Sequence, residues 1–394
     1  MRIGLAGPCA LDLIDQDLPP DLRELEVYSF PLLARLANLY LERGHGVDLF
    51  VTAFDLETPR VVEVSDALTV HVGRRRRRAR DRALDVFRVE RSDLGRLMRA
   101  SSADVLHAHW LYEFAAAGLS AGLPIVVTGH DDPWTLIRHY RHPYWWIRAV
   151  LGMSVLWRAP HVTAVAPSLA RAYRILTVGA RSAAVIPNGI ELPDGAHGEV
   201  PAAPARFALI LNGFDERKNG KAAIAAFAQA RRHLPDATLA AIGTGYGPGE
   251  SAELWAQEKG FAEGVAFLGR LPHQDIRRIL AGGLTALVHP SNWEACSMAI
   301  LEALSFGVPV IGGEASGGVA YTLDGGRAGL LVNVKRPDEI AGAMVRIARS
   351  PELGAELARG GRAACATTFS EESVVDQYEQ VLGDAMRAHR EASR

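Results

Sequence analysis

The sequence predicts an α/β fold made of two domains, each built on a parallel sheet covered by helices. Short apolar runs of strand length alternate with longer segments of helical periodicity along the 394 residues. A stretch rich in proline and glycine interrupts this alternation near the middle of the chain. The composition, with 48% hydrophobic and 22% charged residues, is that of an ordinary globular protein long enough for two domains.

Five strands are predicted in the first half of the chain. The first, at residues 1–6, ends in a glycine–proline turn, and residues 31–43 follow with the apolar spacing of a helix. Glycines at 44 and 46 end this helix, and further strands are predicted at residues 47–52, 104–108, 124–128 and 162–166. Strand–helix–strand repetition produces a parallel sheet with helices on both faces.

The second half repeats the pattern after the interruption. Strands are predicted at residues 206–211, 238–242, 265–268, 286–289 and 309–311. The predicted division is a first domain at 1–191, a linker at 192–205 and a second domain at 206–371, with the last helix (about 372–394) packed back on the first domain. Ligands of open parallel sheets bind beyond the carboxyl ends of the strands, so a cleft between the domains is expected.

Charge and cysteine content exclude several functional classes. The 43 basic and 45 acidic residues give a net charge of −2, which argues against general nucleic-acid binding. Cys9, Cys296 and Cys365 lie far apart, which excludes zinc-finger spacing and suits a reducing compartment, so we expect a cytoplasmic protein. No apolar run approaches the roughly 18 residues that a membrane span needs.

The most informative segment is HPSNWEACSMAILEAL at residues 289–304. It predicts a strand ending at His289, a loop of small residues that carries Glu294, and a helix from about Ser297. The free amides and positive dipole end of such a helix suit a phosphate. Glu294 and Glu302 would be tolerated beside it if they accepted hydrogen bonds from sugar hydroxyls. The alternative is one charge at the helix start and one solvated helix charge.

Two further turns follow strands of the second domain. Residues 211–220 carry the adjacent Arg217 and Lys218, which either neutralise a diphosphate or form a solvated basic pair. Residues 242–249 contain several glycines, starting with Gly243, which permit a ligand to approach the backbone closely or simply form a turn.

Together, and in this order, these segments resemble the family-4 retaining glycosyltransferases, which have the GT-B fold of two Rossmann-like domains facing a cleft. Glu294 and Glu302 match the Glu-x7-Glu motif of that family. The other segments that carry the resemblance are DVLHAHW at 104–110, VTGHD at 127–131, IPNGI at 186–190, GVPVI at 307–311, GG at 317–318 and GLLV at 329–332. They span more than 200 residues.

The resemblance implies roles for individual residues. Lys218 corresponds to the lysine that binds the donor diphosphate. The family's Gly-Arg-Leu is replaced by Asn212-Gly213-Phe214, so we expect Arg217 to compensate for the missing arginine. His130 resembles the histidine near the donor sugar, Glu294 the glutamate near the sugar hydroxyls, and Glu302 the glutamate that holds the ribose. The other expected donor-binding residues are Ala295, Cys296, Ser297 and Met298, whose amides face the diphosphate, Gly269, Arg270 and Leu271 near the base, and Gly243. The expected acceptor or phosphate loop residues are Gly7, Pro8, His109 and Trp134.

The implied reaction is transfer of a sugar from a UDP- or GDP-linked donor to a hydroxyl of a glycan, lipid-linked or small-molecule acceptor, as in polysaccharide biosynthesis. The anomeric configuration is kept, and neither a metal nor another cofactor is expected. The pairs Asp15/Asp17 and His107/His109 have the look of metal ligands, but the sequence offers no supporting ligands. Two other functions stay open: a GT-B nucleotide-sugar epimerase or phosphorylase, and a non-enzymatic basic protein that binds membranes or nucleic acid.

Two segments of the first domain have unusual composition. Residues 74–99 hold eleven arginines and four acidic residues, and residues 133–158 hold four of the seven tryptophans and no acidic residue. One interpretation is a solvated arginine loop and tryptophans packed in the core. The other is contact with an acceptor, or with the inner membrane face as a peripheral protein, through Arg74–Arg82 and Trp145–Trp146.

Overall fold

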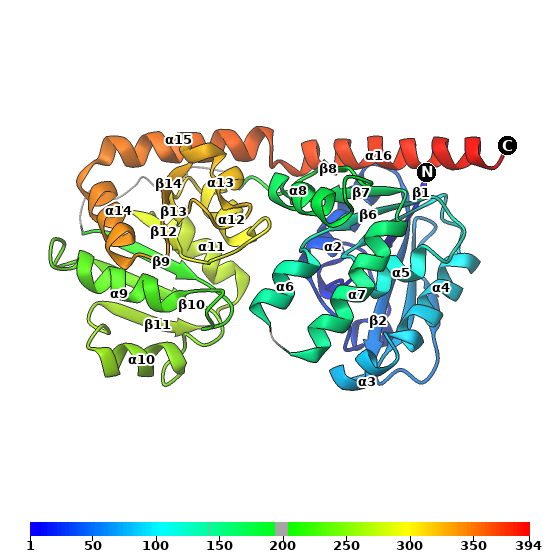
Figure 1. Cartoon of the computed structure of the whole chain (residues 1–394), viewed down its shortest axis with the longest axis horizontal. Helices are drawn as coiled ribbons and strands as arrows, with labels where there is room; N and C mark the ends of the chain where they lie inside the picture. Colours follow the sequence, from blue (N-terminus) through cyan, green and yellow to red (C-terminus); the bar gives the residue numbers. More distant parts are fainter. Residues whose placement is uncertain (141, 194–203) are drawn as a thin grey trace. The chain divides into compact units, whose positions relative to one another are not determined.

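A computed structural model describes residues 1–140, 142–193 and 204–394, and its contacts divide the chain into two compact units (Figure 1). The first unit comprises Met1–Pro187 and Val374–Arg394, and the second comprises Asn188–Ser373. Most of the predicted linker, residues 194–203, lies outside the described residues.

The first unit is built on an eight-stranded sheet with the strand order β3-β4-β2-β1-β5-β6-β7-β8. The pairing is parallel except between β3 and β4. The strands are β1 (Arg2–Ala6), β2 (Gly46–Phe54), β3 (Arg60–Glu63), β4 (Leu68–Arg75), β5 (Val105–His109), β6 (Ile125–Gly129), β7 (His161–Ala164) and β8 (Ala183–Val185). The central strands β5 and β6 are buried along their whole length, as strands covered on both faces must be.

Helices cover both faces of this sheet (Figure 1). They are α1 (Pro20–Arg23), α2 (Pro31–Glu42), α3 (Ala79–Leu84), α4 (Arg88–Ala100), α5 (Glu113–Gly118), α6 (Pro133–His139), α7 (Pro143–Arg158) and α8 (Pro167–Leu176), with a short 3₁₀ turn at Leu11–Leu13. The connection through α2 leads from β1 to β2, toward one edge of the sheet. The connections through α5, α7 and α8 lead from β5 to β8, toward the opposite edge. Because such crossovers are right-handed, α7 and α8 lie on the face opposite α2.

The last helix, α16 (Glu371–Ala392), packs largely on the first unit. Val375, Tyr378 and Leu382 enter the core formed by α2 and β1. The second unit begins at Asn188, four residues before residue 192, where the predicted linker starts. The reason is local: Ile190 donates its backbone N–H to Phe369 at 2.8 Å, and this pairing holds the segment against the second unit.

The second unit has a six-stranded parallel sheet with the order β11-β10-β9-β12-β13-β14. The strands are β9 (Arg206–Ile210), β10 (Thr238–Ile242), β11 (Val265–Gly269), β12 (Ala286–His289), β13 (Val310–Gly313) and β14 (Gly329–Val332). The helices are α9 (Gly220–Ala230), α10 (Ser251–Lys259), α11 (His273–Ala281), α12 (Met298–Ser305), α13 (Val319–Thr322), α14 (Pro337–Arg349) and α15 (Pro351–Thr367), with a 3₁₀ turn at Asp324–Gly326. The strands predicted from apolar runs are therefore all present.

The arginine-rich segment differs from the solvated loop that its composition suggested. Arg74 and Arg75 end β4, and the guanidinium groups of Arg74–Arg77 are bound by carboxylates of the same unit. Arg74 binds Asp93, Arg75 binds Glu113, Arg76 binds Asp85 and Glu90, and Arg77 binds Asp55 and Glu26. Among the described residues, the helices are all too short or too polar to cross a membrane.

Candidate active site

The candidate site of the second unit lies at the carboxyl ends of β9 and β12, which are adjacent parallel strands. The loop after β9 carries Arg217 and Lys218, and the loop after β12 carries Glu294. Lys218 Nζ donates a hydrogen bond to Glu294 Oε1 at 2.6 Å, and Arg217 Nη1 lies 3.6 Å from the same oxygen. Two adjacent basic residues singled out in the sequence thus meet the carboxylate of Glu294, which Lys218 precedes by 76 positions.

The backbone around Glu294 is fixed by the loop after β13. Glu294 donates its N–H to the Ser316 carbonyl at 3.3 Å and accepts from the Gly318 N–H at 2.8 Å. Gly317 lies between them with a φ of +67°, and a Cβ there would sit 2.4 Å from the Glu294 carbonyl oxygen. Glycine is required at 317 because both the left-handed backbone and the close approach exclude a side chain.

Two asparagines join the loops that carry the charged residues. Asn292 donates its N–H to the Arg217 carbonyl at 2.8 Å and its side-chain amide to the Glu216 carbonyl at 2.6 Å. Asn219 donates to the carbonyls of Pro290 and Val334 at 3.0 and 2.8 Å. Because these bonds all end on backbone carbonyls, the separation of the two loops does not depend on the charged pair alone.

The charge on Glu294 is held by its neighbours. His289 Nε2 lies 3.6 Å from Glu294 Oε1, so the carboxylate faces His289, Lys218 and Arg217 together. Burial alone would raise the pKa of Glu294, but the interactions with His289 and Lys218 outweigh burial and hold the pKa well below its ordinary range. Glu294 is therefore ionised and can only accept hydrogen bonds.

Several buried polar atoms near this cluster have no hydrogen-bond partner among the residues that the structure describes. They are Ser291 Oγ, Asn292 Oδ1 and Asn188 Oδ1, with both ring nitrogens of His289. Asn188 uses its amide nitrogen to bind the Cys296 carbonyl at 3.0 Å, which fixes the loop before α12. Unpartnered buried polar groups are rare in folded proteins and are concentrated where a ligand or water completes the bonding.

Glu302 is also engaged, but with a partner that the sequence did not reveal. Its Oε1 lies 3.1 Å from His273 Nε2, at the start of α11. The hydrogen bond to Glu302 raises the pKa of His273 despite its partial burial. His273 follows Gly269, Arg270 and Leu271, the segment expected near the base, and this proximity was the one signal that could have identified it. The predicted amide-bearing residues Ala295, Cys296, Ser297 and Met298 lead directly into α12, which starts at Met298.

Gly243 and Gly269 have a structural reason for being glycine. Gly243 donates its N–H to the Gly269 carbonyl at 2.8 Å, joining the carboxyl ends of β10 and β11. A Cβ on Gly243, where φ is +120°, would lie 1.8 Å from the Leu211 carbonyl oxygen, so the backbones of two turns touch here. Arg270 is exposed and Leu271 is half-buried beside this junction.

The first unit brings two of the predicted histidines together. His109 Nδ1 and His130 Nε2 share a hydrogen bond of 2.9 Å at the ends of β5 and β6. The Trp110 ring lies 4.4 Å from the His130 ring, and Trp110 has a φ of +65°. Burial lowers the pKa of His130 to about 3, so the imidazole is neutral at physiological pH. A Cβ on Gly7 would lie 2.7 Å from Leu33 and 3.3 Å from His109, which places the Gly7 turn beside the histidines.

Asp131 is a residue of the first unit that the sequence analysis did not select. Tyr112 donates its hydroxyl to Asp131 Oδ1 at 2.7 Å, and the Tyr173 hydroxyl donates to the Asp131 carbonyl at 2.6 Å. Burial raises the pKa of Asp131 to about 6. Its position directly after His130 in the family-like segment VTGHD was the available signal.

The remaining predicted acceptor residues lie in different environments. Pro8 is buried, and Trp134 is an exposed residue in the first turn of α6. The Trp145 ring stacks on the Tyr140 ring at 4.7 Å and is half-buried, whereas Trp146 is exposed on α7.

The described part of the chain holds no group of three His, Cys, Asp or Glu side chains arranged for a metal ion. Asp15 accepts from Asn38, and Asp17 pairs with Arg23. His107 bonds to Tyr40 and Thr128 through its two ring nitrogens.

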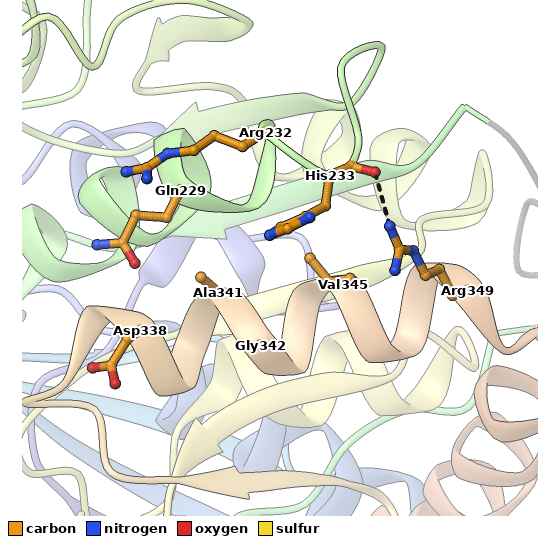
Figure 2. Close-up of a pocket in the computed structure, with 8 residues that line it drawn as sticks. All are labelled: Gln229, Arg232, His233, Asp338, Ala341, Gly342, Val345 and Arg349. Carbon is orange, nitrogen blue, oxygen red and sulfur yellow. Dashed lines mark hydrogen bonds between the residues drawn. The ribbon is translucent and has the colours of Figure 1, made fainter.

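A hollow of about 380 Å³ lies between α9 and α14 of the second unit, away from the residues described above (Figure 2). Its lining residues are Gln229, Arg232, His233, Asp338, Ala341, Gly342, Val345 and Arg349. Arg349 donates to the His233 carbonyl at 3.4 Å (Figure 2). Basic side chains near the carboxyl ends of two helices complement the helix dipoles, and this accounts for their presence here without a ligand.

Family models match both halves of the chain. The model for "Glycosyl transferases group 1" matches residues 200–364, and the model for "Glycosyltransferase Family 4" matches residues 32–193. The chain is a group 1 glycosyltransferase. The resemblance to this group of glycosyltransferases that was drawn from the sequence motifs is confirmed.

Characterised relatives of this glycosyltransferase match it over different lengths. Glycogen synthase of Thermus thermophilus is 33% identical over 144 residues, which is 36% of this chain and 31% of that protein. Glycogen synthase of Mycobacterium tuberculosis is 26% identical over 310 residues, covering 74% of this chain and 72% of that protein. The D-inositol 3-phosphate glycosyltransferase of Acidothermus cellulolyticus is 31% identical over 144 residues, covering 36% of this chain and 31% of that protein. The chain thus spans less than a third of the first of these relatives.

Solved structures confirm the GT-B fold. Sucrose-phosphate synthase of Thermosynechococcus elongatus superposes with a TM-score of 0.75 at 19% identity, over 98% of this chain and 99% of that one. An Escherichia coli structure titled as trehalose-6-phosphate bound with UDP-2-fluoro glucose gives a TM-score of 0.71 at 12% identity, over 98% of this chain and 99% of that one. The predicted two-domain α/β architecture is therefore correct.

Proposed function

We propose that this glycosyltransferase moves a sugar from a nucleoside diphosphate sugar to a hydroxyl acceptor, with retention of configuration and without a metal ion. The observation that carries the proposal is the contact of Lys218 and Arg217 with Glu294 at the carboxyl ends of β9 and β12. Cations and an ionised hydrogen-bond acceptor side by side suit the junction of a diphosphate and a sugar. The Anabaena protein HepE, crystallised with UDP-glucose, shares the fold with a TM-score of 0.67 at 18% identity, over 98% of this chain and 100% of that one.

The proposed step breaks the bond between the anomeric carbon and the diphosphate oxygen and forms a bond from that carbon to the acceptor oxygen on the same face. The electron pair leaves with the diphosphate, whose charge Lys218, Arg217 and the amides before α12 stabilise. The acceptor proton passes to the departing phosphate. Glu294 accepts hydrogen bonds from sugar hydroxyls, and Glu302 accepts them from the ribose in place of His273.

His130 takes a different part in the proposal. Because its pKa is about 3, the imidazole carries no charge at pH 7 and cannot neutralise a phosphate. We assign it a hydrogen bond to a sugar hydroxyl, oriented by His109 at 2.9 Å.

The test is a panel of UDP- and GDP-linked sugars, scored by thermal shift and by product formation, with and without a chelator. A true donor should raise the melting temperature, since ligand binding stabilises the folded state by mass action. Turnover that needs an acceptor and survives the chelator supports the proposal. Donor conversion without an acceptor would indicate an epimerase, and inverted product or loss of activity with chelator would contradict retention or metal independence respectively.

A further inference from the structure

The outward side of α7 carries several exposed apolar side chains. Trp146, Val150 and Trp157 are 51%, 68% and 45% exposed, and their spacing of four and seven residues places them on one side of the helix. Between Pro143 and Trp157 the sequence has one charged residue, Arg148, and its side chain is buried. A helix on the surface of a globular protein normally turns charged residues outward, so α7 has the opposite pattern on its free side.

The apolar surface continues onto α8. Ile175 and Val178, at the end of that helix, are 66% and 87% exposed. Arg181 donates from its guanidinium to the Trp157 carbonyl at 2.6 Å, which brings the end of α7 next to the segment that follows α8. Both helices lie on the same face of the sheet (Figure 1). We call the surface formed by Trp146, Val150, Trp157, Ile175 and Val178 the α7–α8 face.

The segment of sequence that carries the α7–α8 face has charges of a single sign. Between Asp132 and Glu191 the sequence has seven arginines and no acidic residue. Arg158, Arg171 and Arg174 on α7 and α8 are exposed. The arginine-rich segment that first suggested an anionic partner behaves differently, because Arg74–Arg77 are bound by carboxylates of their own unit.

We propose that the α7–α8 face docks this enzyme on the surface of an anionic lipid bilayer. Tryptophan side chains are favoured at the boundary between headgroups and acyl chains, where an apolar ring meets a polar layer. Val150, Ile175 and Val178 would enter the same boundary, and the arginines around them would meet the negative headgroups. The exposed Arg158, Arg171 and Arg174 match an anionic bilayer better than they match a second copy of the chain, which would bring arginine against arginine.

The proposal does not depend on the identity of the donor. It requires only that the folded first unit present this face, so vesicle binding and sugar transfer can fail independently. A membrane-bound enzyme would meet an acceptor with a lipid anchor on a surface rather than in solution.

The experiment is co-sedimentation of the full chain with vesicles of phosphatidylcholine alone and of phosphatidylcholine with 30% phosphatidylglycerol, a composition chosen as about that of a strongly anionic leaflet. We expect binding to the anionic vesicles, weaker binding to the neutral ones, and a loss of binding as salt is raised from about 0.05 to about 0.5 M because salt screens surface charge. Bromine-labelled lipids should quench tryptophan fluorescence in the bound protein.

Two sets of substitutions separate this face from the rest of the surface. Trp146→Gln with Trp157→Gln should lower the partition coefficient about tenfold, in keeping with the loss of two half-exposed apolar side chains. Val150→Gln with Ile175→Gln, at more exposed positions that folding tolerates more easily, should lower it in the same direction. The matched control is Val61→Gln with Leu254→Gln, at residues that are 54% and 57% exposed on β3 and α10. It should bind as the unchanged chain does.

Three results would overturn the proposal. The unchanged chain could remain in the supernatant with both kinds of vesicle. The control pair could lose as much binding as the α7–α8 variants, which would indicate non-specific adsorption. Finally, sedimentation equilibrium without lipid could show a dimer that Val150→Gln with Ile175→Gln dissociates, and the face would then be an interface between two copies.

Discussion

The two units present different chemistry at the carboxyl ends of their parallel strands. In the second unit, Glu294 is an ionised carboxylate within 2.6 to 3.6 Å of Lys218, Arg217 and His289. In the first unit, His109 and His130 share a hydrogen bond beside the Trp110 ring, and burial lowers the pKa of both histidines. One site is a cluster of charges held by backbone contacts, and the other is a set of neutral rings.

In the proposed reaction, two units of the same architecture contribute different kinds of interaction. A charged cluster can exchange its internal ion pair for contacts with an anionic ligand, and this exchange stabilises charge that develops in a reaction. Neutral rings offer shape, stacking and single hydrogen bonds, which orient a carbohydrate without attracting its phosphate. We therefore expect substitutions in the second unit to affect turnover more strongly than substitutions in the first.

The strongest test of this comparison sets Lys218→Met against His130→Gln. In the proposed reaction Lys218 stabilises the leaving diphosphate, so its loss should lower kcat by about 10²- to 10³-fold. Loss of one neutral hydrogen bond should lower it by about tenfold. Both are measured as sugar transfer at saturating donor, once the panel has identified that donor. Lys259→Met, at a lysine on α10 that pairs with Glu258, is the control for removing a lysine and should leave kcat unchanged. Equal losses at Lys218 and His130 would remove the distinction between the units.

A second prediction concerns the backbone that fixes Glu294. Gly317→Ala would place a Cβ 2.4 Å from the Glu294 carbonyl oxygen, whereas Gly325→Ala has the same left-handed φ with nothing within 4 Å. Both substitutions should cost about 1–2 kcal/mol in the free energy of unfolding for the left-handed conformation. Gly317→Ala alone should cost a further 1–3 kcal/mol or so and lower kcat at least about tenfold, because Glu294 must move. Urea unfolding and kcat of the two variants check this, and equal activity would show that the loop tolerates displacement.

A third prediction uses the neutral histidines of the first unit. Burial and the nearby His130 lower the pKa of His107 to about 3, from an ordinary value of 6.5. Below pH 6.5 His107 becomes protonated in the unfolded chain, whereas in the folded chain it stays neutral until about pH 3. The free energy of unfolding therefore falls as pH falls through this window. Each such histidine contributes a slope of up to about 1.4 kcal/mol per pH unit.

The measurement is urea unfolding of the unchanged chain and of His107→Gln between pH 7 and pH 4. The variant should show a shallower loss of stability over this range, even if it is less stable at pH 7. Glu294, whose pKa is held low, contributes stability above pH 4.5 that is lost only as pH falls further, so it adds little to the slope between pH 6.5 and pH 5.

The features that the sequence predicted are those that depend on residues close together in the chain. Strands such as β9 and β12 are apolar runs because parallel strands are buried on both faces, and the loop carrying Glu294 is marked by its small residues and by the helix that follows. The family motifs singled out Lys218 and Glu294, which the structure brings into contact, whereas the role that they imply for Glu302 stays a prediction.

The features that could not be predicted are contacts between residues distant in the chain. His273 and Glu302 are 29 residues apart, and their bond depends on how α11 and α12 are placed by the sheet. The arginine run looks like a solvated loop because its carboxylate partners, among them Glu113 on α5, belong to other elements. Local periodicity also cannot show that the apolar side of α7 faces outward, since a buried helix has the same composition.

The smallest expected effect comes from a substitution far from both sites. It tests whether the chemistry of each site depends only on nearby residues. Gly342 is inside α14, where it borders the hollow in Figure 2, and a Cβ there would meet nothing within 4 Å. Gly342→Ala should raise the free energy of unfolding by about 0.5–1 kcal/mol, because alanine has less conformational freedom to lose than glycine. Gly360→Ala in α15 should do the reverse, since its Cβ would lie 2.1 Å from the Arg327 carbonyl oxygen. If kcat of the Gly342 variant changes together with its free energy of unfolding, the site of the second unit is coupled to its outer helices. The chemistry at the strand ends is then not separate from the scaffold that supports it.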